Sequence, residues 1–234
     1  MTILEKSSSL FVGLLVLLIT TTGIAQITQR SEVGFGLGTL NYTGDLVRSY
    51  NFAFSQPAAT IFYRANLSKV VSFRASLMAG KLSASDTRSP VDAFAVQRNA
   101  SFDIFLSEIS GVYEYHFLDW RDDRRRLRFT PYLFAGLALF NISGVQTKTA
   151  EYSNVQMAIP FGGGVKYVLN PKYYLALELG IRKTFFDYLD NISDGDPSCK
   201  NYQYGNKFDY DTYYFLGITL TRTFYDIPCA RNPY

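Results

Sequence analysis

Hydrophobic and polar residues alternate with a period of two along most of the chain beyond residue 31. Such alternation is typical of a β-strand whose two faces meet different surroundings. It predicts strands at residues 31–41, 57–67, 70–82, 102–118, 127–141, 156–169, 172–187 and 211–224. Strands of soluble sandwiches usually have about five or six residues. The predicted strands are about twice as long, which is enough to cross a bilayer when tilted.

The segment 172–187 shows the alternation clearly. One parity is apolar and contains Tyr173, Leu175, Leu177, Leu179, Ile181 and Phe185. The other parity contains Tyr174, Ala176, Glu178, Gly180, Arg182 and Thr184. In a transmembrane barrel the apolar parity faces lipid and the other parity faces the lumen. We therefore expect Leu175, Leu177, Leu179 and Ile181 to face lipid.

The connections between the predicted strands alternate in length. Short turns fall at 66–69, 119–126 and 170–171, and long connections fall at 42–56, 83–101, 142–155 and 188–210. Transmembrane barrels keep short turns on the periplasmic side and long loops outside. With an even strand count both termini lie in the periplasm, and closure leaves no exposed sheet edge. The sequence predicts an all-β fold: a closed, antiparallel, eight-stranded, up-and-down transmembrane β-barrel.

The N-terminal residues 1–25 have the form of a signal peptide. Lys6 precedes the apolar run 10–19, and Gly23 and Ala25 stand where a cleavage site carries small residues. The run is too short for a transmembrane helix, which needs about 20 residues. We expect residues 26–225 to form the barrel, with 226–234 as a periplasmic tail. These expectations place the mature protein in the bacterial outer membrane, in contact with its lipid.

Composition argues against a nucleic-acid partner. Charged residues make up 18% of the chain, aromatic residues 16%, and the net charge is only +3. A soluble domain carries about 25% charged residues, so the surface is short of charge and rich in rings. The basic run 124–126 is preceded by two aspartates, and we interpret it as a solvated turn.

The lumen-facing parity carries a group of ionisable residues that we name the lumen charge cluster. Its members are Glu32, Arg64, Arg74, Glu108, Glu114, Lys166, Glu178 and Arg182. The four acids balance the four bases, and a lumen of eight strands is about wide enough for side chains to fill. The cluster could be a proton or ion path, or a salt-bridged plug that closes the lumen. The balance of charge favours the plug.

Other motifs do not indicate catalysis or a cofactor. The glycines at 34, 36 and 38 resemble a dinucleotide-binding string, but they lie within one strand and no helix follows. His116 is the single histidine, and its place near the periplasmic end argues against a catalytic triad acting at the outer rim. No His–Cys grouping suggests a metal. Cys199 and Cys229 are predicted on opposite membrane faces, so they should not form a disulfide.

The segment at 38–46 reads Gly-Thr-Leu-Asn-Tyr-Thr-Gly-Asp-Leu, and 184–190 reads Thr-Phe-Phe-Asp-Tyr-Leu-Asp. Together with 158–162, 177–180 and 217–221, these segments resemble motifs of a family of Bacteroidota outer-membrane barrels that includes PorG of the type IX secretion system. The residues that carry the resemblance are Gly38, Asn41, Tyr42, Gly44, Asp45, Asp187, Tyr188 and Asp190.

The resemblance implies a non-enzymatic membrane component without a cofactor. It also implies partners among periplasmic or outer-membrane proteins of the secretion machinery, contacted by the short turns and the tail. The alternative is a stand-alone small barrel whose outer loops bind external partners, as adhesion or defence barrels do.

Overall fold

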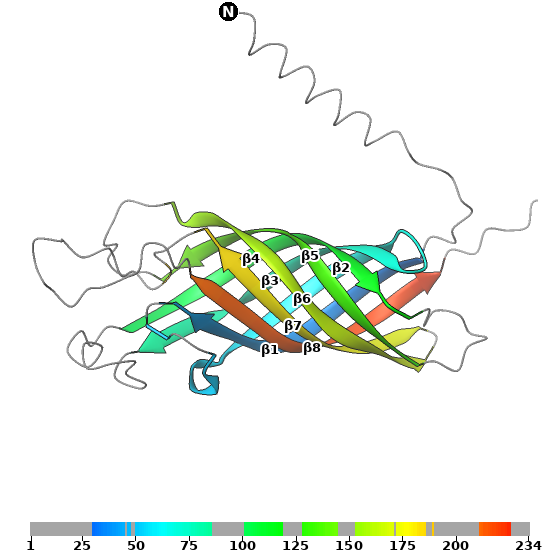
Figure 1. The fold of residues 1–234 in the computed structure, drawn as a ribbon, viewed down its shortest axis with the longest axis horizontal. Helices are drawn as coiled ribbons and strands as arrows, with labels where there is room; N and C mark the ends of the chain where they lie inside the picture. The colour runs from blue at the N-terminus through cyan, green and yellow to red at the C-terminus, as the bar shows by residue number, and fades with distance from the viewer. Residues whose placement is uncertain are drawn as a thin grey trace, which may run out of the picture.

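A computed structural model of the protein describes residues 30–44, 46–47, 50–85, 101–118, 128–144, 153–170, 172–185, 189 and 211–225. The chain forms eight strands, and Figure 1 shows them as long, tilted and wrapped around one axis. The strands are β1 (Arg30–Thr43), β2 (Gln56–Asn66), β3 (Val71–Ser85), β4 (Ser101–His116), β5 (Phe129–Ser143), β6 (Val155–Asn170), β7 (Tyr173–Thr184) and β8 (Thr212–Tyr225). A single 3-10 turn, η1 (Phe52–Phe54), is described between β1 and β2.

The sheet closes on itself because β1 pairs with β8 as well as with β2. All eight neighbouring pairs are antiparallel. Each residue can be traced to its paired residue on the next strand. Starting from Gly36, this path ends at Gln156 on β6 in one direction around the barrel and at Lys166 on β6 in the other. This stagger of ten residues tilts the strands and brings side chains distant in sequence to one level. The predicted closed eight-stranded barrel is confirmed.

Six of the eight strands extend further into the long connections than the sequence predicts, whereas β7 ends at Thr184 and β8 begins at Thr212, inside the predicted bounds of 187 and 211. β3 continues to Ser85, and β5 runs to Ser143 rather than ending at 141. Leu82, Ala84 and Ile142 remain buried inside the barrel in these extensions. Their packing against one another favours continued strand pairing, and alternation alone does not predict this packing.

The predicted signal peptide (1–25) and tail (226–234) lie outside the described residues.

The parity of the strands agrees with the predicted inside and outside. In β7, Leu175, Leu177 and Leu179 are 38%, 54% and 46% exposed, whereas Ala176 and Glu178 are buried. Large apolar side chains cover the outer face of every strand. A sheet that exposes apolar residues outward and buries charges inward reverses the pattern of a soluble barrel.

No helix in the described parts of the chain is both long and apolar enough to cross a bilayer.

The interior has two halves. We call the end of the barrel with the turn at 67–70 the short-turn end, and the opposite end, where β3 and β5 finish, the long-loop end. Apolar side chains fill the interior near the long-loop end, including Leu40, Leu82, Leu106, Phe140 and Ile142. Leu46, Val47, Phe54 and Leu189, which lie in connections, are buried in the same cluster and help to cover this end. The polar half lies nearer the short-turn end.

Candidate functional site: the barrel interior

All eight residues of the lumen charge cluster lie inside the barrel, and each is at most 5% exposed. Alternation places them there, because every second residue of each strand points inward. Isolated buried charges cost several kcal/mol each, so their partners decide whether this interior is stable.

Glu114 on β4 lies at the centre of the cluster. Its carboxylate oxygens lie 2.9 Å from Arg64 Nε, 2.9 Å from Arg74 Nε and 2.7 Å from Lys166 Nζ. Three cations from three other strands therefore meet at one acid. The ion pairs tie β2, β3 and β6 to β4 across the lumen.

Two further acids balance the arginines. Arg64 Nη1 donates to Glu32 Oε2 at 2.6 Å, and Asn66 Nδ2 donates to the other Glu32 oxygen at 2.8 Å. Arg74 makes a fork-shaped pair with Glu178, with bonds of 2.6 and 3.1 Å. Bidentate pairs of this kind are among the stronger hydrogen-bonded contacts in proteins.

Aromatic rings fill the space around the charges. The Phe62 ring lies 4.8 Å from the Arg64 guanidinium and 5.3 Å from that of Arg74. The Phe134 ring lies 5.0 Å from the Arg74 guanidinium. A Cβ on Gly34 would lie 2.2 Å from the tip of the Phe62 ring. Gly34 therefore makes room for this ring inside a strand, and no helix follows it, so the dinucleotide interpretation does not apply.

Glu108 and Arg182 form a separate and looser pair nearer the apolar half. Arg182 Nε lies 3.4 Å from Glu108 Oε2, which also accepts a bond of 2.8 Å from the Tyr213 hydroxyl. Glu108 Oε1 and Arg182 Nη1 are buried, and neither has a hydrogen-bond partner among the described residues. The interior thus contains a tight ionic centre and a weaker pair beside it.

His116 belongs to the tight centre, which the sequence interpretation missed. Its Nε2 lies 2.6 Å from Lys166 Nζ, and its Nδ1 lies 3.2 Å from the Val70 carbonyl. Nδ1–H can donate to that carbonyl, leaving Nε2 to accept from the lysine ammonium. The parity that His116 shares with Glu114 on β4 could have predicted this place. Tyr132 was also missed, and its hydroxyl donates to Glu178 at 2.7 Å.

The motif segment at 38–46 builds the mouth at the long-loop end. The Tyr42 hydroxyl donates to Asp211 Oδ1 at 2.6 Å, and the Leu189 backbone N–H donates to Asp211 Oδ2 at 2.9 Å. A Cβ on Gly44 would lie 2.0 Å from the Tyr42 hydroxyl oxygen, so this place requires glycine. Asn41 Nδ2 donates to the Asn51 carbonyl at 2.6 Å.

These contacts join the end of β1, the connection after β7 and the residue before β8 at one end of the barrel. Asp211 joins these segments, and no pattern in the sequence marked it as a residue of this mouth. Of the other residues that carry the resemblance, Gly38 lies in β1. Asp45, Asp187, Tyr188 and Asp190 lie outside the described residues, as do both cysteines.

The interior side chains can neutralise one another's charges and fill the lumen. Within the described residues, no group of three or more His, Cys, Asp or Glu side chains could hold a metal ion. The one histidine is fully buried and bonded to a lysine, which is not the arrangement of a base beside a nucleophile.

This fold, with apolar residues outside and paired charges inside, is that of the eight-stranded barrels of bacterial outer membranes. The chain belongs to the family described as Domain of unknown function (DUF6089), whose model matches residues 8–232. No curated protein matches the sequence.

Solved structures with a similar fold include Neisserial surface protein A (NspA). Its TM-score is 0.54 at 13% identity, with 83% of this chain and 97% of that chain covered. OprG from Pseudomonas aeruginosa gives a TM-score of 0.49 at 8% identity, with 85% of this chain and 97% of that chain covered. Ail of Yersinia pestis gives a TM-score of 0.46 at 9% identity, with 85% of this chain and 100% of that chain covered. At these identities the likeness concerns the fold.

Proposed function

We propose that this protein is a non-enzymatic, integral outer-membrane component whose barrel is closed by its own side chains. On this proposal it anchors a membrane assembly, such as the type IX secretion machinery, and does not conduct solutes. The observation that carries the proposal is the ion-paired centre around Glu114, which links four strands across the lumen.

The outer face supports insertion in a membrane. Exposed aliphatic residues such as Leu133, Leu137 and Leu177 cover its middle. Most exposed aromatic residues lie toward the two ends: Tyr63, Tyr113, Tyr115, Phe129, Tyr167 and Phe224 near the short turns, and Phe105 and Phe185 near the long loops. Phe35 and Phe161 lie nearer the middle of their strands. Aromatic girdles around an apolar band are typical of outer-membrane barrels. The short-turn end would then face the periplasm.

The interior of the barrel favours the role of an anchor and argues against that of a pore. Charges that are paired in several directions cannot be released one at a time without leaving an uncompensated buried charge. At the long-loop end, Leu46, Phe54 and Leu189 cover an apolar interior, which excludes water. Both halves therefore oppose a continuous aqueous path.

Participation in a secretion assembly rests on the motif resemblance to the family that includes PorG. The short-turn end would supply the contact, and its described part exposes Lys69, Arg128 and Lys172. A stand-alone barrel would use its long-loop end for external partners.

Affinity purification from membranes distinguishes these roles. The full chain and a variant lacking 226–234 are compared after mild crosslinking. We expect the full chain to recover periplasmic proteins at a fixed ratio, and the shortened chain to lose them while remaining folded. Recovery of extracellular ligands alone, unchanged by the deletion, would refute the assembly role and favour the stand-alone barrel.

A further inference from the structure

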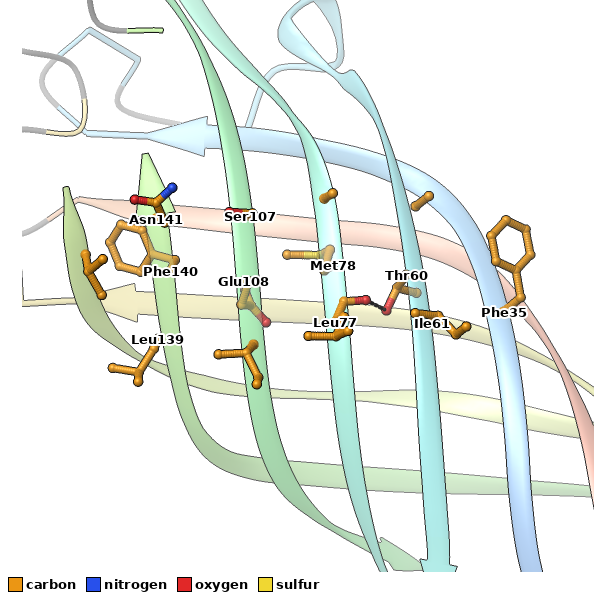
Figure 2. A pocket seen from close by; sticks show the side chains of 14 residues that line it. Phe35, Thr60, Ile61, Leu77, Met78, Ser107, Glu108, Leu139, Phe140 and Asn141 are labelled. Atoms are coloured by element: carbon orange, nitrogen blue, oxygen red, sulfur yellow. Dashed lines mark hydrogen bonds between the residues drawn. The ribbon is translucent and has the colours of Figure 1, made fainter. Parts of the chain in front are cut away.

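The outer face of the barrel carries a groove of about 560 Å³ that crosses β1 to β6. Figure 2 shows its labelled residues running from Phe35 at one end, past Ile61 and Leu77, to Leu139 and Asn141 at the other. Asn141 lies two residues before the end of β5, so the groove rises from mid-barrel toward the long-loop end.

The strand register explains the groove as a valley beside an apolar ridge. A row of small or polar residues, which we call the valley row, is formed by directly paired Ala59, Ala79, Ser107 and Asn141. Two residues away along each strand runs a ridge of Ile61, Leu77, Ile109 and Leu139, which are also directly paired. These apolar ridge side chains are between 47% (Leu139) and 57% (Ile109) exposed. On the other side of the valley row, Lys81 pairs with Phe105.

The width of the valley limits what can occupy it. On the side away from the ridge, Lys81 and Phe105 lie four residues from Leu77 and Ile109 along β3 and β4, or about 13 Å between Cα positions. Side chains on both sides narrow this space further, so a helix of about 10–12 Å diameter cannot lie on the floor of the groove between β3 and β4. A single extended hydrocarbon chain can.

Polarity changes along the valley in the way that an amphiphile requires. The mid-barrel end is walled by Phe35 and Ile61, which are both 52% exposed. The end toward the long loops offers Ser107 and Asn141, and the exposed Lys81 stands one outward position beyond Ala79. An exposed acid, Asp103, also lies on this side of the valley row, two residues beyond Phe105 on β4. A cation near the membrane surface attracts an anionic headgroup.

We propose that this groove binds one anionic lipid of the outer leaflet, with an acyl chain in the valley row and a phosphate at Lys81. The proposal rests on the proposed function, because that places the long-loop end at the outer surface of the membrane. It adds a specific lipid site to an otherwise general apolar face.

The test uses the full chain in nanodiscs of equal parts phosphatidylglycerol and phosphatidylcholine, released into detergent and weighed by native mass spectrometry. We expect one retained lipid per chain, with phosphatidylglycerol preferred. Ala79→Phe fills the valley and should abolish retention. Ala75→Phe is the matched control, because Ala75 lies on the same strand and face but outside the groove. If Ala79→Phe does not fold, Ser107→Phe fills the same valley.

The charge is tested with Lys81→Gln, which should lower the preference for phosphatidylglycerol about fivefold. Lys183→Gln removes an outward charge on β7, away from the groove, and should leave the preference unchanged. Equal losses from the two alanine variants, or from the two lysine variants, would overturn the site. So would a wild-type chain that retains no lipid. Loss of periplasmic partners, in contrast, bears on the proposed function and leaves lipid retention unaffected.

Discussion

Replacing Glu114 with glutamine tests the ionic centre most selectively. The change keeps the shape of the side chain and removes its charge. Three cationic nitrogens lie 2.7–2.9 Å from this carboxylate. At an effective dielectric constant of about 20, each contact contributes about 6 kcal/mol of attraction before the cost of desolvation. Removing one partner of a buried pair costs about 3–5 kcal/mol net, and we expect Glu114→Gln to lower the free energy of unfolding by that amount.

The matched control is Glu108→Gln. Glu108 faces a single cation at 3.4 Å and a tyrosine hydroxyl at 2.8 Å, so its loss should cost about 1–3 kcal/mol. A double variant, Glu114→Gln with Lys166→Met, removes one stranded cation and should recover part of the loss. Unfolding in guanidinium from phospholipid vesicles, followed by heat-modifiable gel mobility, measures all three. A Glu114→Gln cost no larger than that of Glu108→Gln would refute the central role of Glu114.

Three further results are expected. Leu177→Arg should cost about 2–4 kcal/mol in the same unfolding assay, whereas Ala176→Ser on the inner face should cost less than about 1 kcal/mol; equal costs would mean that the register is wrong by one residue. Tyr42→Phe should cost about 1.5–3 kcal/mol, because Asp211 loses a buried charge-assisted bond of 2.6 Å; an unchanged stability would show that the mouth contacts are not structural. A membrane-impermeant thiol reagent on intact cells should label Cys199 and spare Cys229, and a crosslink between the two would contradict the predicted topology.

Alternation was sufficient to predict the barrel and which side chains face inward. It needs only the period of two and the length of the strands, so the eight members of the lumen charge cluster were found. Their partners could not be found in the same way. Arg74 and Glu178 are 104 residues apart in sequence, and they meet because the stagger of the closed sheet brings β3 and β7 to one level.

The mouth at the long-loop end was harder to predict for a different reason. Asp211 and Leu189 lie at or beyond the ends of strands, where alternation stops, and their contacts depend on how connections fold back. His116 was predictable, because it shares its parity with Glu114 on β4 and alternation therefore places it in the lumen.

Conductance across a planar bilayer tests most directly whether the interior side chains close the barrel. Purified, refolded protein is added to a bilayer beside a porin of known conductance as a positive control. The ion-paired centre and the apolar half near the long-loop end predict no steady conductance steps and no passage of sugar-sized solutes. A stable, porin-like conductance from the wild-type protein would contradict the account.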